Sequence, residues 1–162
     1  GKGLEGTVEF FPEEGKYHFD GHRKCGVSLS PVEAERLGGI CPVCGKKLTM
    51  GVDHRVEQLA DREEGFVKKD GKKYESLVPL PEVVAACMGY STASKKVHGC
   101  FEQMMQTLGT EFDILRNVPA EDIKSCAGER IAEGIENVRT GNVKRIPGYD
   151  GEYGKIQLFD EN

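Results

Sequence analysis

The sequence lacks the features that mark several common classes of protein. Its 162 residues include no tryptophan, and no apolar run approaches the roughly 20 residues that are needed to cross a bilayer. No signal-peptide pattern opens the chain. With 38% hydrophobic and 30% charged residues, the composition is typical of a globular protein. We therefore expect a cytoplasmic protein that does not associate with membranes.

The chain also lacks the positive net charge that is usual for proteins that bind nucleic acids. Its formal charge is -5 at pH 7. Basic residues nevertheless occur in adjacent pairs, and two of these pairs, Arg23/Lys24 and Lys46/Lys47, lie within or beside cysteine-containing segments. Most such pairs lie on a solvated surface. Their placement therefore gives DNA binding only modest support.

The sequence motifs of several enzyme classes are absent as well. There is no Walker motif, no serine nucleophile elbow and no HExxH sequence. The four histidines are too few for a second, catalytic metal centre of the multi-histidine kind. We predict no catalytic residue in this chain, and whether it is part of an enzyme stays open at this point.

The cysteines, by contrast, form a pattern that is typical of a metal site. The run Cys41-Pro-Val-Cys44-Gly places two thiolates where they can reach one ion, and His22-Arg-Lys-Cys25-Gly repeats this pattern with histidine first. The 15 residues between Cys25 and Cys41 suit a structural site with four ligands. We predict one zinc ion bound by His22, Cys25, Cys41 and Cys44.

His18 and His54 are alternatives to His22 for the fourth ligand position, and His22 is preferred because its spacing to Cys25 and Gly26 repeats that of the second pair. A closed shell of three thiolates and one imidazole leaves no position for water, so the ion is expected to be structural. A deaminase site needs His-x-Glu and Pro-Cys-x-x-Cys. Here Arg23 and Lys24 follow His22, and Ile40 precedes the second cysteine pair, which excludes that reading.

The first 62 residues contain short β-type runs and two short helices. Residues 7–11 and 16–19 are aromatic or β-branched and are separated by Pro-Glu-Glu-Gly, which predicts a hairpin. Ser30 followed by proline predicts the start of a helix at residue 31. A second short helix is expected at 53–62 with Asp53 as its cap. We therefore expect residues 1–62 to form a small β module like a zinc ribbon.

From residue 63 onwards the hydrophobic pattern becomes that of helices. Apolar residues recur with helical spacing over 97–108 and again over 123–138. Gly109 and Gly141 are expected to end these helices, and Gly128 to divide the second. A glycine-rich loop at 147–154 precedes a short strand at 155–159. Residues 63–162 are thus predicted to form a mainly helical domain, and the whole chain to be α+β.

Several segments resemble the central region of the endonuclease Q family. The long matching stretches are residues 8–27 and the run Cys41-Pro-Val-Cys44-Gly-Lys with residues 54–62, and further matches lie at 76–82 and 148–154. The resemblance implies a PHP-type metal-dependent nuclease domain joined to a zinc finger and a helical C-terminal region. Family members nick DNA on the 5′ side of deaminated bases such as uracil and hypoxanthine, and at abasic sites.

By this resemblance, the chain is the zinc and C-terminal part of such an enzyme without its nuclease domain, and the absence of an initiator methionine agrees with that expectation. The resemblance implies DNA, the missing N-terminal nuclease domain and repair or replication proteins as partners. Nicking by the isolated chain is not expected.

We hypothesise that the chain binds DNA and recognises lesions for a repair endonuclease. The residues that we expect to contact DNA lie near the predicted metal site. Among them, Tyr17, His54 and Arg55 are candidates for contacting a flipped base, together with Phe19. The residues predicted to contact nucleic acid are Tyr17, Arg23, Lys24, Lys46, Lys47, His54 and Arg55. The alternative is a zinc-stapled protein-interaction module that does not bind nucleic acid.

Overall fold

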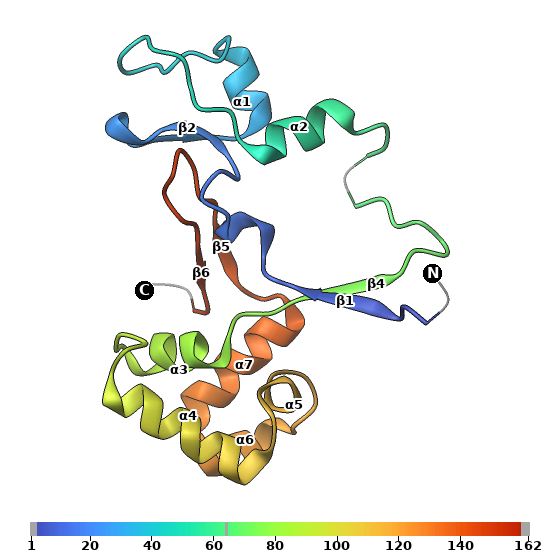
Figure 1. The fold of residues 1–162 in the computed structure, drawn as a ribbon, viewed down its shortest axis with the longest axis vertical. Coiled ribbons are helices and arrows are strands. Elements are labelled where there is room, and N and C mark those ends of the chain that lie inside the picture. Colours follow the sequence, from blue (N-terminus) through green and yellow to red (C-terminus); the bar gives the residue numbers. More distant parts are fainter. Residues whose placement is uncertain (1–2, 64, 160–162) are drawn as a thin grey trace. The chain divides into compact units, whose positions relative to one another are not determined.

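The structure, a computed structural model, describes residues 3–63 and 65–159 of the chain, which combine helices with short strands (Figure 1). This confirms the predicted α+β class. The strands are β1 (Gly6–Glu9), β2 (Asp20–His22), β3 (Val27–Leu29), β4 (Lys73–Ser76), β5 (Lys144–Ile146) and β6 (Lys155–Gln157). The helices are α1 (Pro31–Arg36), α2 (Val52–Leu59), α3 (Leu80–Met88), α4 (Lys95–Leu108), α5 (Glu111–Arg116), α6 (Ala120–Ala127) and α7 (Glu129–Thr140).

The chain divides into two compact units whose segments alternate along the sequence. Within the described residues, unit 1 contains 3–7, 11–75 and 145–156, and unit 2 contains 8–10, 76–144 and 157–159. The contiguous domains 1–62 and 63–162 stay a prediction, whereas these units each take segments from both halves of the chain. No helix in the described part of the chain is long and apolar enough to span a bilayer.

Unit 1 is built around the antiparallel pair β2–β3, in which Asp20 lies opposite Leu29 and His22 opposite Val27. Its small core contains Val27, Ala34, Cys41 and Leu48. The predicted hairpin of 7–11 with 16–19 is wrong. β1 pairs with β4 instead, and residues 12–14 form a single 3-10 turn. The sequence pattern showed two extended runs but not the distant strand that supplies the partner hydrogen bonds.

The two short helices of unit 1 begin close to where the sequence places them. Ser30 caps α1 and forms a reciprocal capping box with Glu33, while Pro31 occupies the first turn, as predicted. α2 begins one residue before Asp53, and its cap is Gly51. A Cβ at Gly51 would lie 2.3 Å from the carbonyl oxygen of His18, so this cap has room only for glycine.

Unit 2 consists of α3 to α7 around an apolar core. The predicted helix over 97–108 is α4, which ends before Gly109, and Gly128 separates α6 from α7 as expected. Gly141 ends α7 in the left-handed conformation, with φ 72°. The largest fully buried hydrophobic side chains of this unit are Leu80, Val83, Val84, Val97, Met104, Ile114, Ile123 and Ile135.

The glycine-rich loop predicted at 147–154 folds back onto the N-terminal part of unit 1. Gly148 donates its backbone N–H to the carbonyl of Glu13 at 2.8 Å and accepts the N–H of Phe19 at 2.9 Å. The N–H of Gly151 donates to the carbonyl of Lys16 at 2.8 Å. These bonds join segments more than 100 residues apart, and they bring the loop to the segment that leads into β2.

Candidate metal centre

Four side chains converge at the end of β2. One ligand atom from each of His22, Cys25, Cys41 and Cys44 lies within 4.8 Å of the others, and His22 Nδ1 is 3.5 Å from Cys44 Sγ. Ligand atoms about 2.0–2.3 Å from a tetrahedral ion are roughly 3.3–3.8 Å apart, so a small contraction would complete such a shell. The group can bind a metal ion.

Both ligand pairs are held by tight turns that end in a left-handed glycine. His22 closes β2, and a 3-10 turn over 23–25 carries Cys25 and ends at Gly26 with φ 64°. In the second pair, the N–H of Gly45, with φ 70°, donates to the carbonyl of Cys41 at 2.9 Å. The structural repeat follows the sequence repeat because glycine adopts positive φ without a steric cost.

The thiols of this group influence one another. Burial, followed by hydrogen bonds to the thiols of Cys44 and Cys41, raises the pKa of Cys25 to about 11. Burial also acts to raise the pKa of Cys41, but hydrogen bonds from the backbone N–H groups of Cys44 and Val43 and from the thiols of Cys44 and Cys25 together hold that pKa below its ordinary value. A cation would stabilise all three thiolates at once, since metal ligation requires the deprotonated form.

The other two histidines considered as ligands lie outside this group. His18 stacks on the ring of Phe19, with 5.3 Å between the ring centroids. His54 is buried, and its Nδ1 is 2.6 Å from Oδ2 of Asp20. The structure thus brings His22 to the cysteines and gives His54 a carboxylate partner.

Asp150, which the sequence analysis did not single out, accepts hydrogen bonds from the first ligand turn and from a segment that follows the second. Asp150 Oδ2 accepts the backbone N–H of Arg23 at 2.7 Å, and its Oδ1 accepts the Thr49 hydroxyl at 2.6 Å. The hydrogen bond from Thr49, and then that from Arg23, hold the pKa of Asp150 below its ordinary value. The Asp-Gly pair at 150–151 signals a turn, but not what the turn contacts.

Asp150 adopts a backbone conformation that is uncommon for its residue type. Its φ is 43°, in the left-handed region, which aspartate tolerates better than most residues. The neighbouring Tyr149 packs so closely on Gly21 that a Cβ there would lie 2.5 Å from its ring. The loop therefore contacts β2 immediately before the ligand His22.

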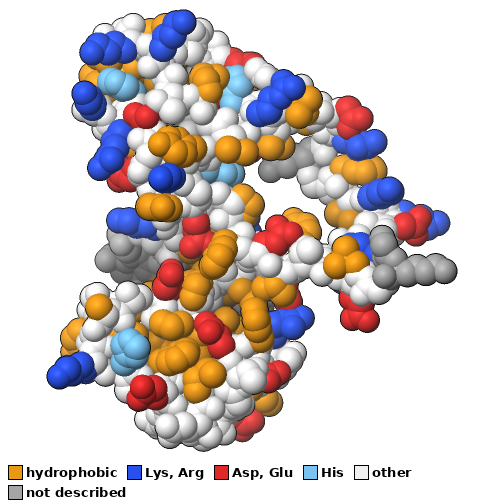
Figure 2. All heavy atoms as spheres, in the orientation of Figure 1, with side chains coloured by type: hydrophobic (Ala, Val, Ile, Leu, Met, Phe, Trp, Pro, Cys, Tyr) orange, Lys and Arg blue, Asp and Glu red, His pale blue; other side chains and the backbone are white. Residues whose placement is uncertain are grey.

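Most of the residues predicted to contact nucleic acid are exposed. Around the surface formed by α1, β2 and α2, Figure 2 shows several Lys and Arg side chains. Arg55 bonds to Gln58 across the exposed side of α2 at 3.1 Å, whereas His54 on the same helix is only 7% exposed. The exposed members of the predicted set are Tyr17, Arg23, Lys24, Lys46, Lys47 and Arg55.

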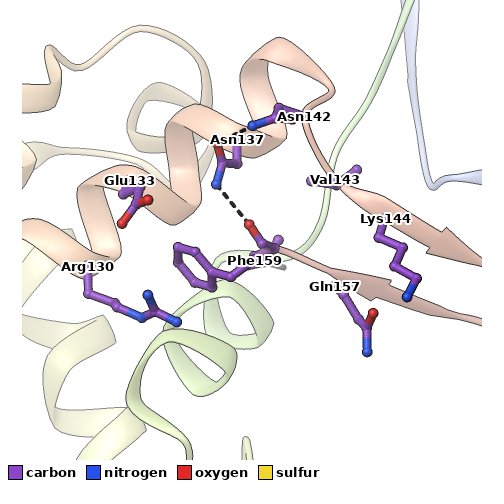
Figure 3. A pocket seen from close by; sticks show the side chains of 9 residues that line it. Arg130, Glu133, Asn137, Asn142, Val143, Lys144, Gln157 and Phe159 are labelled. Carbon is purple, nitrogen blue, oxygen red and sulfur yellow. Dashed lines mark hydrogen bonds between the residues drawn. The ribbon is translucent and has the colours of Figure 1, made fainter. Parts of the chain in front are cut away.

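Unit 2 has a polar cavity of its own, with a volume of about 390 Å³ (Figure 3). The guanidinium of Arg130 lies 3.5 Å from the ring centroid of Phe159, and Asn137 donates to the carbonyl of Leu158 at 2.8 Å. These contacts attach the segment 157–159 to α7. Sequence analysis missed them, since a lone aromatic residue near a chain end carries no pattern.

Comparison with protein families and curated proteins gives matches along most of the chain. Residues 79–142 match the family described as the MJ0043 C-terminal domain. The chain is 33% identical over 149 residues to the uncharacterized protein MJ0043 of Methanocaldococcus jannaschii, covering 91% of this chain and 18% of that protein. It is 29% identical over 147 residues to YqxK of Bacillus subtilis, covering 90% of this chain and 34% of that protein.

Two solved structures share the fold. One is the lesion-specific endonuclease PfuEndoQ from Pyrococcus furiosus, with a TM-score of 0.81 and 32% identity over 93% of this chain and 37% of that one. The other is endonuclease Q in complex with a 27-mer duplex that has an abasic lesion at the active site. Its TM-score is 0.78, with 31% identity over 94% of this chain and 38% of that one.

These matches confirm the resemblance to endonuclease Q that the sequence predicts. They also set its extent, because the chain spans less than two fifths of either solved relative and about a third or less of either curated one.

Proposed function

We propose that this chain is the zinc-containing, DNA-binding and lesion-recognition portion of a DNA repair endonuclease that acts on deaminated bases or abasic sites. The observation that carries the proposal is the similarity to endonuclease Q over nearly the whole chain, at more than 30% identity. In this proposal the nuclease chemistry comes from a PHP-type domain, as in the family that the sequence resembles.

Zinc is the metal that best suits the donor set. Three thiolates and one imidazole are ligands that a structural zinc ion takes in tetrahedral geometry. His22, Cys25, Cys41 and Cys44 would hold it, and the ion would supply rigidity to the two turns. Since the shell is closed, the residues around it, and not the ion, would contact DNA.

The rigid turns would hold the neighbouring basic side chains in place as a surface that contacts DNA. Arg23 and Lys24 lie between the ligands His22 and Cys25, and Lys46 and Lys47 follow the second pair. All four are exposed, and Arg23 would exchange an exposed ion pair with Glu152, at 4.0 Å, for a phosphate. Phosphate contacts of this kind position a protein on DNA without reading its sequence. Tyr17 and Arg55 are further exposed candidates.

The test is binding of the metal-loaded protein to duplexes that are undamaged or contain one deoxyuridine, deoxyinosine or abasic site. If about four phosphates are neutralised, the logarithm of the affinity should fall by roughly 3.6 for each tenfold rise in salt. Replacing Lys46 and Lys47 together by Met should weaken binding to all duplexes and make this slope shallower by about 2. A matched control replaces Lys68 and Lys69, which lie away from the ligand segments.

A protein-interaction module is the second candidate, and one observation favours it. α2 exposes an apolar stripe of Val52, Val56 and Leu59, which are 64%, 57% and 64% exposed. These residues recur at helical spacing and would suit a protein partner. The salt series separates the two candidates. Absence of salt-dependent affinity for any of the duplexes would exclude unaided DNA binding and leave the interaction module.

A further inference from the structure

The polar cavity of unit 2 takes no residue from the metal centre, and all of its lining residues belong to unit 2. Its volume of about 390 Å³ falls in the range of small-molecule sites, roughly 300–1,000 Å³. Two cationic side chains line it, Arg130 in the first turn of α7 and Lys144 at the start of β5. Among the described residues in its wall, Glu133 is the one acidic side chain.

An aromatic ring holds Arg130 in place. The guanidinium carbon lies 3.5 Å from the centroid of the Phe159 ring, a distance at which the cation must lie with one face against the ring. Its N–H groups point outward in the plane of the guanidinium and stay available at its edge. In Figure 3 the side chain extends past the ring toward the side of the cavity where Lys144 and Gln157 lie. An arginine fixed in this way loses less conformational entropy on binding than a freely rotating one.

Neither cation of the cavity forms an ion pair with any described residue, although Glu133 lines the same wall. Other cations close by are paired. Arg139 on α7 lies 3.5 Å from a carboxylate oxygen of Glu136, and a second pair joins α6 to the start of α7 at 2.8 Å. Two cations that share a wall without a counter-ion create a positive potential that a bound anion would stabilise.

Amide groups fix the rest of the wall. Asn137 donates to the carbonyl of Leu158 at 2.8 Å, and its Oδ1 accepts the side-chain N–H of Asn142 at 3.2 Å. These bonds connect α7 to the segment before Phe159 and to the turn after the helix. Because the amide of Asn137 is used in this way, the charged ends of Arg130 and Lys144 are the main donors that the cavity offers to a ligand.

This set of donors selects an anion. The guanidinium edge matches two oxygens of a phosphate, and the lysine ammonium adds a second point of charge. A phosphate monoester carries about −1.5 to −2 charges at pH 7, which matches two cations better than a carboxylate does. We propose that this cavity binds the phosphate group of a phosphate monoester such as a nucleotide, with Arg130 and Lys144 donating to the phosphate oxygens.

Such a phosphate has two sources, a free mononucleotide or the 5′ end of a DNA strand, and both present the same group. The site is separate from the proposed function, whose DNA contacts lie in unit 1.

Calorimetric titration of the full, metal-loaded chain with deoxyadenosine 5′-monophosphate and with deoxyadenosine separates the phosphate from its carrier. The nucleotide should bind at least about tenfold more tightly, because each hydrogen bond between charged groups contributes roughly that factor. Equal affinity for the two, or no binding of the nucleotide at millimolar concentration, would overturn the proposal.

Variants of exposed residues link the effect to the cavity. Arg130→Gln should weaken nucleotide binding by roughly tenfold, and Lys144→Met should weaken it several-fold. Glu133→Gln keeps an acceptor oxygen but removes a like charge, so it should strengthen binding. Lys95→Met, at an exposed position of α4 outside the cavity, is the matched control and should leave the affinity unchanged. An unchanged affinity in Arg130→Gln would overturn the proposal.

Oligonucleotides of one sequence with a 5′-phosphate or a 5′-hydroxyl distinguish the two sources of the phosphate. If Arg130→Gln weakens only the binding of the phosphorylated strand, the ligand is a DNA end; if it weakens neither, the ligand is a free nucleotide. Equal weakening of both would place Arg130 on the DNA backbone and overturn a monoester site. Nucleotide binding without affinity for any duplex would keep this cavity and remove the proposed function, and duplex binding without nucleotide binding would do the reverse.

Discussion

The two compact units of this chain are stabilised by different kinds of interaction. Every helix of unit 2 contributes buried apolar side chains to its core. The buried hydrophobic residues of unit 1 are Phe11, Val27, Ala34, Cys41 and Leu48. Unit 1 also buries Asp20 and His54, which are the two buried polar side chains among the described residues.

This difference shows what a unit with few buried apolar side chains needs in order to fold. A unit that buries too little apolar surface to offset its loss of conformational entropy usually depends on a metal or another cross-link. Cys41 belongs both to the small core and to the candidate ligand group, so a bound metal ion and packing would act on the same residue. The helices of unit 2 do not share that dependence.

The largest expected effect separates the two units. Removing the metal with a chelator, or replacing Cys41 by Ser, should abolish amide-exchange protection in unit 1 and leave that of α4 and α7 in place. The reason is that metal-binding free energy is folding free energy in such sites. Metal analysis should find about one ion per chain before treatment. Undiminished protection of β2 and β3 in metal-free protein would contradict this view of unit 1.

A core substitution should have the opposite pattern. Met104 is fully buried in unit 2, so Met104→Ala should destabilise that unit by about 2–5 kcal/mol through the lost contacts and the cavity. The metal content should not change. Chemical denaturation measures the loss, and Gln106→Ala, at an exposed position of the same helix, is the matched control. Loss of metal in Met104→Ala would mean that the units are more strongly coupled than their separate cores indicate.

The smallest of these effects concerns Asp150, and it tests how far the metal centre depends on the end of the chain. Asp150→Ala removes the hydrogen bonds from the Arg23 N–H and the Thr49 hydroxyl. Because Arg23 adjoins the ligand His22, metal affinity should fall by up to about tenfold, the low end of what direct partners of ligands contribute. Competition with a chromophoric chelator measures the affinity. Asp70→Ala, an exposed position of unit 1, should leave it unchanged. An unaltered metal affinity in Asp150→Ala would show that the loop at 147–154 packs beside the metal site without supporting its ligands.

Local sequence patterns predicted much of the secondary structure. The start of α1 after Ser30, the end of α4 at Gly109 and the division at Gly128 follow from backbone preferences that neighbouring residues decide. The hairpin of 7–11 with 16–19 failed because strand pairing is decided by distant segments. β1 found its partner in β4, more than 60 residues later.

Part of the candidate site could be predicted in the same way. The spacing of the cysteines and their glycines identified the group that the structure brings together, with His22 as its histidine. The sequence left His18 and His54 open because the partner of a histidine depends on which residues surround it after folding. Only the structure pairs His54 with Asp20, 34 residues away.

The amino-acid order was enough to place the elements whose causes are local: the start of α1 after Ser30, the glycine-ended turns and the two ligand pairs with their spacing. Which segments share a unit, the hydrogen bond from Arg23 to Asp150 and the pairing of His54 with the buried Asp20 emerged only in the folded chain. The physical reason is that a capping or turn preference acts over a few residues, whereas burial and hydrogen-bond partners depend on contacts between segments far apart in the chain.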